Sequence, residues 1–206
     1  MKIIQTISLL GCGKLGFPLA LDLIKEGYNI RGSTTTPAKI DKLKKSGITP
    51  YLINIDECIK LDFLYSDILV LTLPYKKFMT DSNHYKFQIQ TVCDNLRYSS
   101  IKHIIFTSSS SVYPKDNKLY LPTDKFIPPN TRAEILLDCE QALYKMKNVS
   151  VIIIRLGGIY GVGRKINKSK KARRLIKQSD AISLIKESIK RVGENDFING
   201  FQIMVL

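Results

Sequence analysis

The sequence is poor in cysteine and histidine, and it has no apolar run long enough for a membrane span. Its four cysteines lie far apart and form no Cys-x-x-Cys pair, and neither of its two histidines has a neighbour that suggests a catalytic triad or a metal site. No stretch approaches the roughly 20 consecutive apolar residues of a transmembrane helix. We therefore expect a protein of the cytoplasm with reduced thiols, without a bound metal and without a membrane contact.

The strongest motif lies near the N-terminus. An apolar run leads into Gly11-Cys12-Gly13-Lys14-Leu15-Gly16, a helix-like segment follows over residues 17–26, and a second apolar run ends at Arg31. This order of strand, glycine turn, helix and strand is that of a dinucleotide-binding unit. There, the first glycine permits a sharp turn, the second lets a pyrophosphate approach the backbone, and the third lets helix and strand pack closely. We therefore expect cofactor phosphates at the positive end of the helix, against Gly11, Gly13, Lys14, Leu15 and Gly16.

The same stretch has a second interpretation, a lipoprotein signal that ends at Cys12. Its apolar segment is short and is broken by Gln5, Thr6 and Ser8. An amphipathic helix, rather than a polar tether, follows the cysteine. The dinucleotide-binding interpretation is therefore favoured.

Strand-like and helix-like segments alternate through the rest of the chain. The predicted helices span 38–45, 84–98, 131–147 and 180–192, and the predicted strands span 48–53, 67–73, 101–107, 149–155 and 201–206. This alternation predicts an α/β fold with a doubly wound parallel sheet, Rossmann-like, whose ligands bind at the carboxyl ends of the strands. A chain of 206 residues fits one domain, residues 1–206.

The end of the second predicted strand bears on the choice between NAD and NADP. In an NAD site, an acidic residue about 20 residues beyond the glycines binds the 2′-hydroxyl of the ribose. Residues 31–36 contain no acidic residue, and Arg31 or Lys39 is a neighbouring cation. Three hydroxyl residues stand there instead, Ser33, Thr34 and Thr35. We therefore favour NADP over NAD, although the same hydroxyls also suit the N-cap of a helix that begins near Pro37.

The net charge of +14 is concentrated in one segment, residues 164–177. This segment holds eight basic side chains and no acidic one, whereas the 24 basic residues elsewhere exceed the 18 acidic residues by only six. It contains no aromatic residue that would stack on nucleic-acid bases, so binding of nucleic acid is disfavoured. We expect a solvated loop here, with capture of a phosphate-bearing ligand as the alternative.

Three motifs together resemble the extended short-chain dehydrogenase/reductase superfamily, in its NAD(P)-dependent epimerase/dehydratase group. They are the glycine turn, the serine-rich strand end over 106–114 (Phe-Thr-Ser-Ser-Ser-Ser-Val-Tyr-Pro), and residues 155–164 (Arg-Leu-Gly-Gly-Ile-Tyr-Gly-Val-Gly-Arg). The end of the second strand further resembles an atypical branch of nucleoside-diphosphate-sugar epimerases. The resemblance covers residues 2–164. It implies an NAD(P)-dependent oxidoreductase or epimerase with a small-molecule substrate, a nucleotide sugar being one candidate, and a homodimer as a candidate assembly.

The resemblance also implies which residues act at the site. In the family, a Tyr-x-x-x-Lys pair moves the proton of the reacting hydroxyl and a serine orients its oxygen. The tyrosine and lysine positions fall on Arg132 and Leu136, so the pair is missing, and a guanidinium cannot replace a phenolate base. The serine position falls best on Ser109, with Ser110 as a near neighbour, and Arg132 is left with orienting or stabilising an anion. Tyr113 is the nearby phenol for a proton-transfer role, with packing beneath the loop as its alternative.

The remaining cofactor contacts follow from the same resemblance. Five residues at strand ends are expected to contact the cofactor: Leu73, Pro74, Thr107, Ser108 and Tyr160. The nicotinamide is expected to lie toward Ser109, Tyr113 and Tyr160. The sequence ends at Leu206, where members of the family continue and build most of the substrate-binding lobe. This reduced lobe and the missing pair favour the alternative function, a catalytically inactive protein that binds NADP(H) as a sensor or through a partner. The retained Ser109 and Tyr160-Gly161 motifs favour the enzyme.

Overall fold

The computed structural model describes residues 5–57, 59–75, 83–116, 118–161 and 172–205. In these ranges the main sheet has seven strands in the order β3-β2-β1-β4-β5-β6-β9, and every neighbouring pair is parallel. The strands are β1 (Thr6–Leu10), β2 (Asn29–Thr34), β3 (Thr49–Leu52), β4 (Ile68–Leu71), β5 (His103–Ser109), β6 (Ser150–Leu156) and β9 (Asp196–Gly200). The strand order reverses between β1 and β4, so the prediction of a doubly wound parallel sheet is confirmed.

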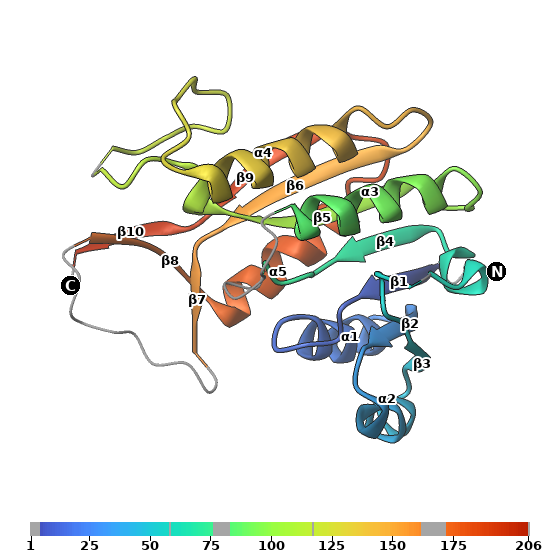
Figure 1. Cartoon of the computed structure of the whole chain (residues 1–206). Helices are drawn as coiled ribbons and strands as arrows, with labels where there is room; N and C mark the ends of the chain where they lie inside the picture. Colours follow the sequence, from blue (N-terminus) through green and yellow to red (C-terminus); the bar gives the residue numbers. More distant parts are fainter. Residues whose placement is uncertain (1–4, 58, 76–82, 117, 162–171, 206) are drawn as a thin grey trace.

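Helices cover both faces of this sheet (Figure 1). One face carries α3 (His84–Leu96) and α4 (Thr131–Tyr144), and the other carries α1 (Gly16–Lys25), α2 (Ile40–Lys45) and α5 (Gln178–Ile189). Successive residues of β4 divide between the two layers. Leu69 and Leu71 pack in the cluster with α3 and α4, whereas Ile68 and Val70 pack in the cluster with α1 and α5. Because both faces are covered, β4 is a continuous run of buried residues.

The described α-helices are between 6 and 14 residues long. None of them combines the length and apolar character that a bilayer crossing needs.

A strand is confirmed within the predicted range 201–206, but it is not the strand that extends the main sheet. The strand that extends the main sheet is β9, which is parallel to β6, and Gly200 is its last residue. The following strand, β10 (Gln202–Val205), belongs instead to a second sheet of order β10-β8-β7. An edge strand is covered incompletely, and four of the five β9 residues are only half-buried. For that reason β9 lacks the continuous apolar run that marks the central strands.

The expected loop over the basic segment is also wrong for its described part. Residues 172–177 form β8 (Ala172–Lys177), which is parallel to β7 (Gly158–Tyr160) and antiparallel to β10. The Arg174 guanidinium lies over the rings of Tyr113, Tyr120 and Phe201, at 5.3, 5.5 and 5.7 Å, and donates to the Pro114 carbonyl at 2.9 Å. This cation therefore packs on aromatic rings rather than in solvent. Residues 164–171 of the basic segment lie outside the described residues.

Candidate functional site

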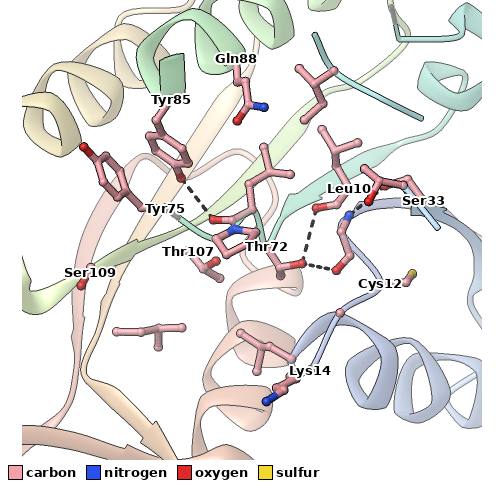
Figure 2. Close-up of a pocket in the computed structure, with 18 of the residues that line it drawn as sticks. Leu10, Cys12, Lys14, Ser33, Thr72, Tyr75, Tyr85, Gln88, Thr107 and Ser109 are labelled. Carbon is pink, nitrogen blue, oxygen red and sulfur yellow. Dashed lines mark hydrogen bonds between the residues drawn. The ribbon is translucent and has the colours of Figure 1, made fainter. Parts of the chain in front are cut away.

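A cavity of about 630 Å³ lies at the carboxyl ends of β1, β2, β4, β5 and β6, on both sides of the switch point. Figure 2 shows Cys12 and Ser33 on one side of this cavity and Ser109 on the other. Most of the predicted cofactor residues line it: Gly11, Gly13, Lys14, Leu15, Ser33, Thr34, Thr35, Leu73, Pro74, Thr107, Ser108 and Tyr160. Gly16 is the exception. Of the predicted catalytic residues, Ser109 and Arg132 line the cavity and Tyr113 does not.

The glycine turn is held by hydrogen bonds from β2 and from the residue that follows β4. The N–H of Gly11 donates to Ser33 Oγ at 2.9 Å, and the N–H of Cys12 donates to the Ser33 carbonyl at 2.8 Å. On the other side, Thr72 Oγ1 donates to the Gly11 carbonyl at 2.7 Å (Figure 2). Gly11 has a φ of +112°, which favours glycine. The shape of the turn is therefore set by contacts within the protein.

The other two glycines of the turn have different surroundings. A Cβ atom at Gly16 would lie 2.2 Å from the Gly11 carbonyl oxygen and 2.6 Å from Leu9 Cδ2, so a side chain there would push α1 away from β1. A Cβ atom at Gly13 would meet no protein atom within 4 Å. Gly16 thus permits close packing, whereas Gly13 exposes backbone to the cavity.

Cys12 fills space beneath the turn. Its side chain is buried, and a Cβ atom at Gly32 would lie 2.6 Å from its Sγ. Burial raises the pKa of the Cys12 thiol to about 12. The thiol therefore stays protonated near neutral pH, although it lies close to a helix N-terminus that would favour the thiolate.

The hydroxyl residues at the end of β2 differ in exposure. Ser33 and Thr34 are buried, and Thr34 Oγ1 accepts the N–H of Thr36 at 3.1 Å. Thr35 is exposed and lines the cavity together with Lys39, the last residue of the short helix η1 (Pro37–Lys39). Thr36 occupies the N-cap position of η1 without a side-chain capping bond. The capping alternative is therefore not observed at this residue.

Arg31 does not contribute to the cavity. Its guanidinium donates to the carbonyls of Asp62 and Tyr65, the latter at 2.5 Å. Of the two cations expected near a 2′-phosphate, Lys39 lines the cavity and Arg31 does not. The expectation for Arg31 is corrected, because its donors are held by backbone carbonyls at the other end of the strand.

Two serines at the end of β5 point to different partners. Ser109 is half-buried in the cavity wall, and its Oγ accepts the N–H of Ser111 at 3.2 Å at the start of η3 (Ser110–Val112). Ser108 is buried and donates to Glu140 Oε1 at 2.5 Å. Ser109 is therefore the serine whose hydroxyl proton is available to a ligand in the cavity.

Tyr113 lies outside the cavity wall and is 1% exposed. Its hydroxyl donates to Asn199 Oδ1 at 2.8 Å and accepts from Arg155 Nη1 at 2.8 Å. Its ring stacks on Tyr120 with centroids 5.1 Å apart. The packing alternative describes this environment, and the expected proton-transfer role is corrected, because the phenol has no open face toward a ligand.

Residues that the sequence analysis missed come from α3 and from the loop after β3. His84 Nε2 lies 2.9 Å from Asp56 Oδ1, and Gln88 Nε2 donates to the same oxygen at 2.9 Å. Tyr85 donates to the Leu73 carbonyl at 3.3 Å, and burial raises the pKa of its phenol, which therefore stays neutral. All of these residues line the cavity. No local motif marks them, because the two segments meet only across the folded sheet.

Comparisons with known sequences identify relatives of the chain. Residues 6–118 match the profile of the NAD binding domain of 6-phosphogluconate dehydrogenase. The chain is also 31% identical over 166 residues to protein YeeZ of Escherichia coli, in strains K12 and O157:H7, over 78% of this chain and 61% of the relative. It thus spans about three fifths of the length of these curated relatives.

Solved structures share the fold at lower identity. UDP-N-acetylglucosamine 4-epimerase from Methanobrevibacter ruminantium M1, in complex with UDP-N-acetylmuramic acid, aligns with a TM-score of 0.80 and 16% identity over 100% of this chain and 79% of that chain. UDP-N-acetylglucosamine 4-epimerase from Bacillus cereus aligns with a TM-score of 0.77 and 16% identity over 98% and 80%. A functionally unknown conserved protein from Silicibacter pomeroyi DSS aligns with a TM-score of 0.76 and 19% identity, over 98% of this chain and 74% of that chain. Identities this low establish the fold alone.

The profile match covers more than half of the 206 residues. It includes the glycine turn, the end of β2 and the serine-rich end of β5, which together form much of the cavity wall. The chain therefore belongs to the family of the NAD binding domain of 6-phosphogluconate dehydrogenase.

Proposed function

We propose that the cavity binds an NAD(P) dinucleotide, with NADP preferred over NAD. The observation that carries this proposal is the open space over Gly13, in a rigid glycine turn at the switch point of the sheet. A pyrophosphate placed there meets backbone N–H groups and the positive end of α1, whose first turn holds no acidic residue. The cavity continues from this turn in both directions, which suits the two halves of a dinucleotide.

The adenosine half and the nicotinamide half of the dinucleotide are expected at opposite ends of the cavity. The adenosine ribose lies toward Thr35 and Lys39, where no carboxylate of β2 repels a 2′-phosphate. The nicotinamide lies toward Ser109 and Tyr160. This direction follows the motif, in which the glycine turn and the end of the second strand receive the adenosine half.

The activity that we propose is that of an atypical NAD(P)-dependent oxidoreductase or nucleotide-sugar epimerase. The bound cofactor supplies hydride transfer, and the protein orients the reactants. Ser109 donates a hydrogen bond to the substrate oxygen and so orients it, and Arg132 orients the substrate. The similarity in fold to UDP-N-acetylglucosamine 4-epimerases supports a nucleotide sugar as one candidate substrate. We further propose a homodimer in the cytoplasm as the working assembly. The buried free thiols of Cys12, Cys93 and Cys139 agree with a reducing compartment.

A second candidate is a protein that binds NADP(H) without turnover. It is favoured by the absence of the Tyr-x-x-x-Lys pair, whose positions hold Arg132 and Leu136. In addition, the phenol of Tyr113 is enclosed and that of Tyr85 stays neutral. Loss of hydride exchange in Ser109→Ala, with cofactor affinity unchanged, would favour the enzyme over the sensor.

Calorimetric titration of the purified protein with NADPH, NADH and their oxidised forms tests cofactor binding. Wild type is expected to bind NADPH more tightly than NADH. Gly13→Asp should abolish binding of every dinucleotide, because its carboxylate occupies the open space and repels the pyrophosphate. Thr123→Asp is the matched control, since it adds the same charge at an exposed position outside the cavity wall. Absence of dinucleotide binding by folded wild type, or equal binding by Gly13→Asp, would contradict the proposal.

A further inference from the structure

Arg132 is a cation in the wall of the cavity, in the first turn of α4. Its Nε is buried and has no hydrogen-bond partner among the residues that the structure describes. The N-terminus of α4 is already capped, because the Asn130 side chain accepts the N–H of Ala133 at 3.1 Å. A positive charge in the first turn opposes the helix dipole. The position of Arg132 is therefore electrostatically unfavourable within the described protein.

No described carboxylate compensates this charge, and each acidic residue of α4 is otherwise engaged or turned away. Asp138 pairs with Lys86 at 2.8 Å, and Glu140 pairs with the buried Arg155 at 2.7 Å. Glu134 is exposed and stands two residues beyond Arg132, a spacing at which side chains do not face each other on a helix. The guanidinium therefore has no carboxylate partner among the described residues, and Arg132 lines the cavity.

Aromatic rings hold the guanidinium in place from one side. Its Cζ lies 4.6 Å from the centre of the Tyr75 ring, which in turn packs on Tyr85 with centroids 5.1 Å apart. Figure 2 shows Tyr75 on the Ser109 side of the cavity, away from Ser33 and Cys12. A cation over a ring keeps its charge and its in-plane donors free for a further ligand.

We propose that Arg132 binds an oxyanion of the substrate, a carboxylate or a phosphate, beside Ser109. This inference deepens the proposed function, because it names the substrate class: a hydroxyl or carbonyl compound that carries a carboxylate or phosphate near the reacting carbon. The planar guanidinium matches the two oxygens of such a group with two parallel hydrogen bonds. Binding of the oxyanion would supply a countercharge for the guanidinium, and it would offset the positive charge at the positive end of α4.

The test uses inorganic phosphate and malonate as probes, at constant ionic strength set with sodium chloride. The rise in the thermal unfolding midpoint with probe concentration gives a dissociation constant for each protein. We expect a saturable rise for wild type and binding at least about tenfold weaker in Arg132→Gln. Arg132→Lys keeps the positive charge but loses the two parallel donors of the guanidinium, so it should also weaken binding. Arg97→Gln is the matched control, because Arg97 is an exposed arginine at the C-cap of α3, paired with Asp94 at 3.5 Å.

Gly13→Asp separates this site from the glycine turn. Our proposal requires that Gly13→Asp keep the affinity for the probes while losing the dinucleotide. Phosphate binding that is lost in Gly13→Asp and kept in Arg132→Gln would place the anion at the turn and overturn the proposal. Dinucleotide binding that is absent in wild type, with probe binding still dependent on Arg132, would contradict the proposed function and leave the oxyanion site standing.

The thermal unfolding midpoint measured without any probe separates a binding role of Arg132 from a structural role. If Arg132 serves to bind an anion, Arg132→Gln should be as stable as wild type or more stable, because it removes a buried unpartnered donor. A large loss of stability in Arg132→Gln, together with probe affinity unchanged in Arg132→Lys, would show a structural role instead. A preference for phosphate over malonate, or the reverse, would identify the anionic group that the substrate carries.

Discussion

Lys39 is the side chain on which the preference between the two cofactors depends most directly. It is exposed and lines the cavity beside Thr35, at the end of a strand that offers no carboxylate to a ribose 2′-hydroxyl. Lys42 lies one turn further along the chain and sits over the ring of Phe17, at 4.6 Å, outside the cavity wall. The two lysines therefore form a matched pair for testing NADP recognition.

We expect Lys39→Gln to weaken NADPH binding about tenfold and to leave NADH binding nearly unchanged, because only NADPH carries the 2′-phosphate. Calorimetric titration of both cofactors measures the ratio. Lys42→Gln should retain the wild-type ratio. An equal loss of affinity for both cofactors in Lys39→Gln would argue against contact with the 2′-phosphate.

At the scale of elements, a buried ion pair joins α4 to β6. Arg155 Nη2 lies 2.7 Å from Glu140 Oε2, and the two side chains are 6% and 1% exposed. Ser108 of β5 donates to the same carboxylate, and Tyr113 accepts from the guanidinium. The network therefore ties the serine-rich strand end, which forms part of the cavity wall, to the helix that carries Arg132.

Glu140→Gln is expected to lower the free energy of unfolding by about 3 kcal/mol, because it leaves the Arg155 guanidinium buried without a countercharge. Urea unfolding followed by circular dichroism measures the change. Glu134→Gln, at an exposed position on the same helix, should stay within about 0.5 kcal/mol of wild type. A loss below about 1 kcal/mol for Glu140→Gln would show that solvent or another group compensates the arginine.

For the whole molecule, His103 couples stability to pH. It lies buried at the start of β5, with Nε2 donating to the Ser188 carbonyl of α5 at 3.1 Å and Nδ1 at 2.6 Å from Ser150 Oγ of β6. Burial lowers the pKa of this imidazole below its ordinary value of 6.5. The unfolded chain therefore binds a proton more readily than the folded one, so stability is full above about pH 6.5 and falls as the pH is lowered.

The unfolding free energy is accordingly expected to fall as the pH is lowered below about 6.5, with a slope from this group of at most about 1.4 kcal/mol per pH unit. Denaturant titrations across this range measure the slope. His103→Gln should flatten the profile, and His84→Gln, which keeps the buried imidazole, should retain the His103 contribution. An identical slope in wild type and His103→Gln would exclude this residue as the cause.

The local pattern of the sequence determined the architecture and half of the cavity. Buried parallel strands are continuous apolar runs, so β1, β4, β5 and β6 were recognisable without the fold. The glycine turn was recognisable too, because backbone geometry requires glycine at fixed spacing. Once the sheet is parallel, its carboxyl ends meet at one edge, and the positions of Ser33, Thr107 and Ser109 follow. These features depend on neighbours in the chain, so the sequence alone was sufficient.

Only the tertiary structure decided the features that depend on contacts between distant segments. Tyr113 belongs to an enclosed hydrogen-bond network with Asn199 and Arg155. Arg174 packs on aromatic rings, although its segment was expected to be a solvated loop. The bond between His84 and Asp56 joins α3 to the loop after β3. Likewise, the lack of a partner for Arg132 Nε among the described residues is visible only once the neighbouring segments have been placed. The physical reason is that burial and pairing are properties of packed surfaces, and a local sequence pattern does not encode which surfaces meet.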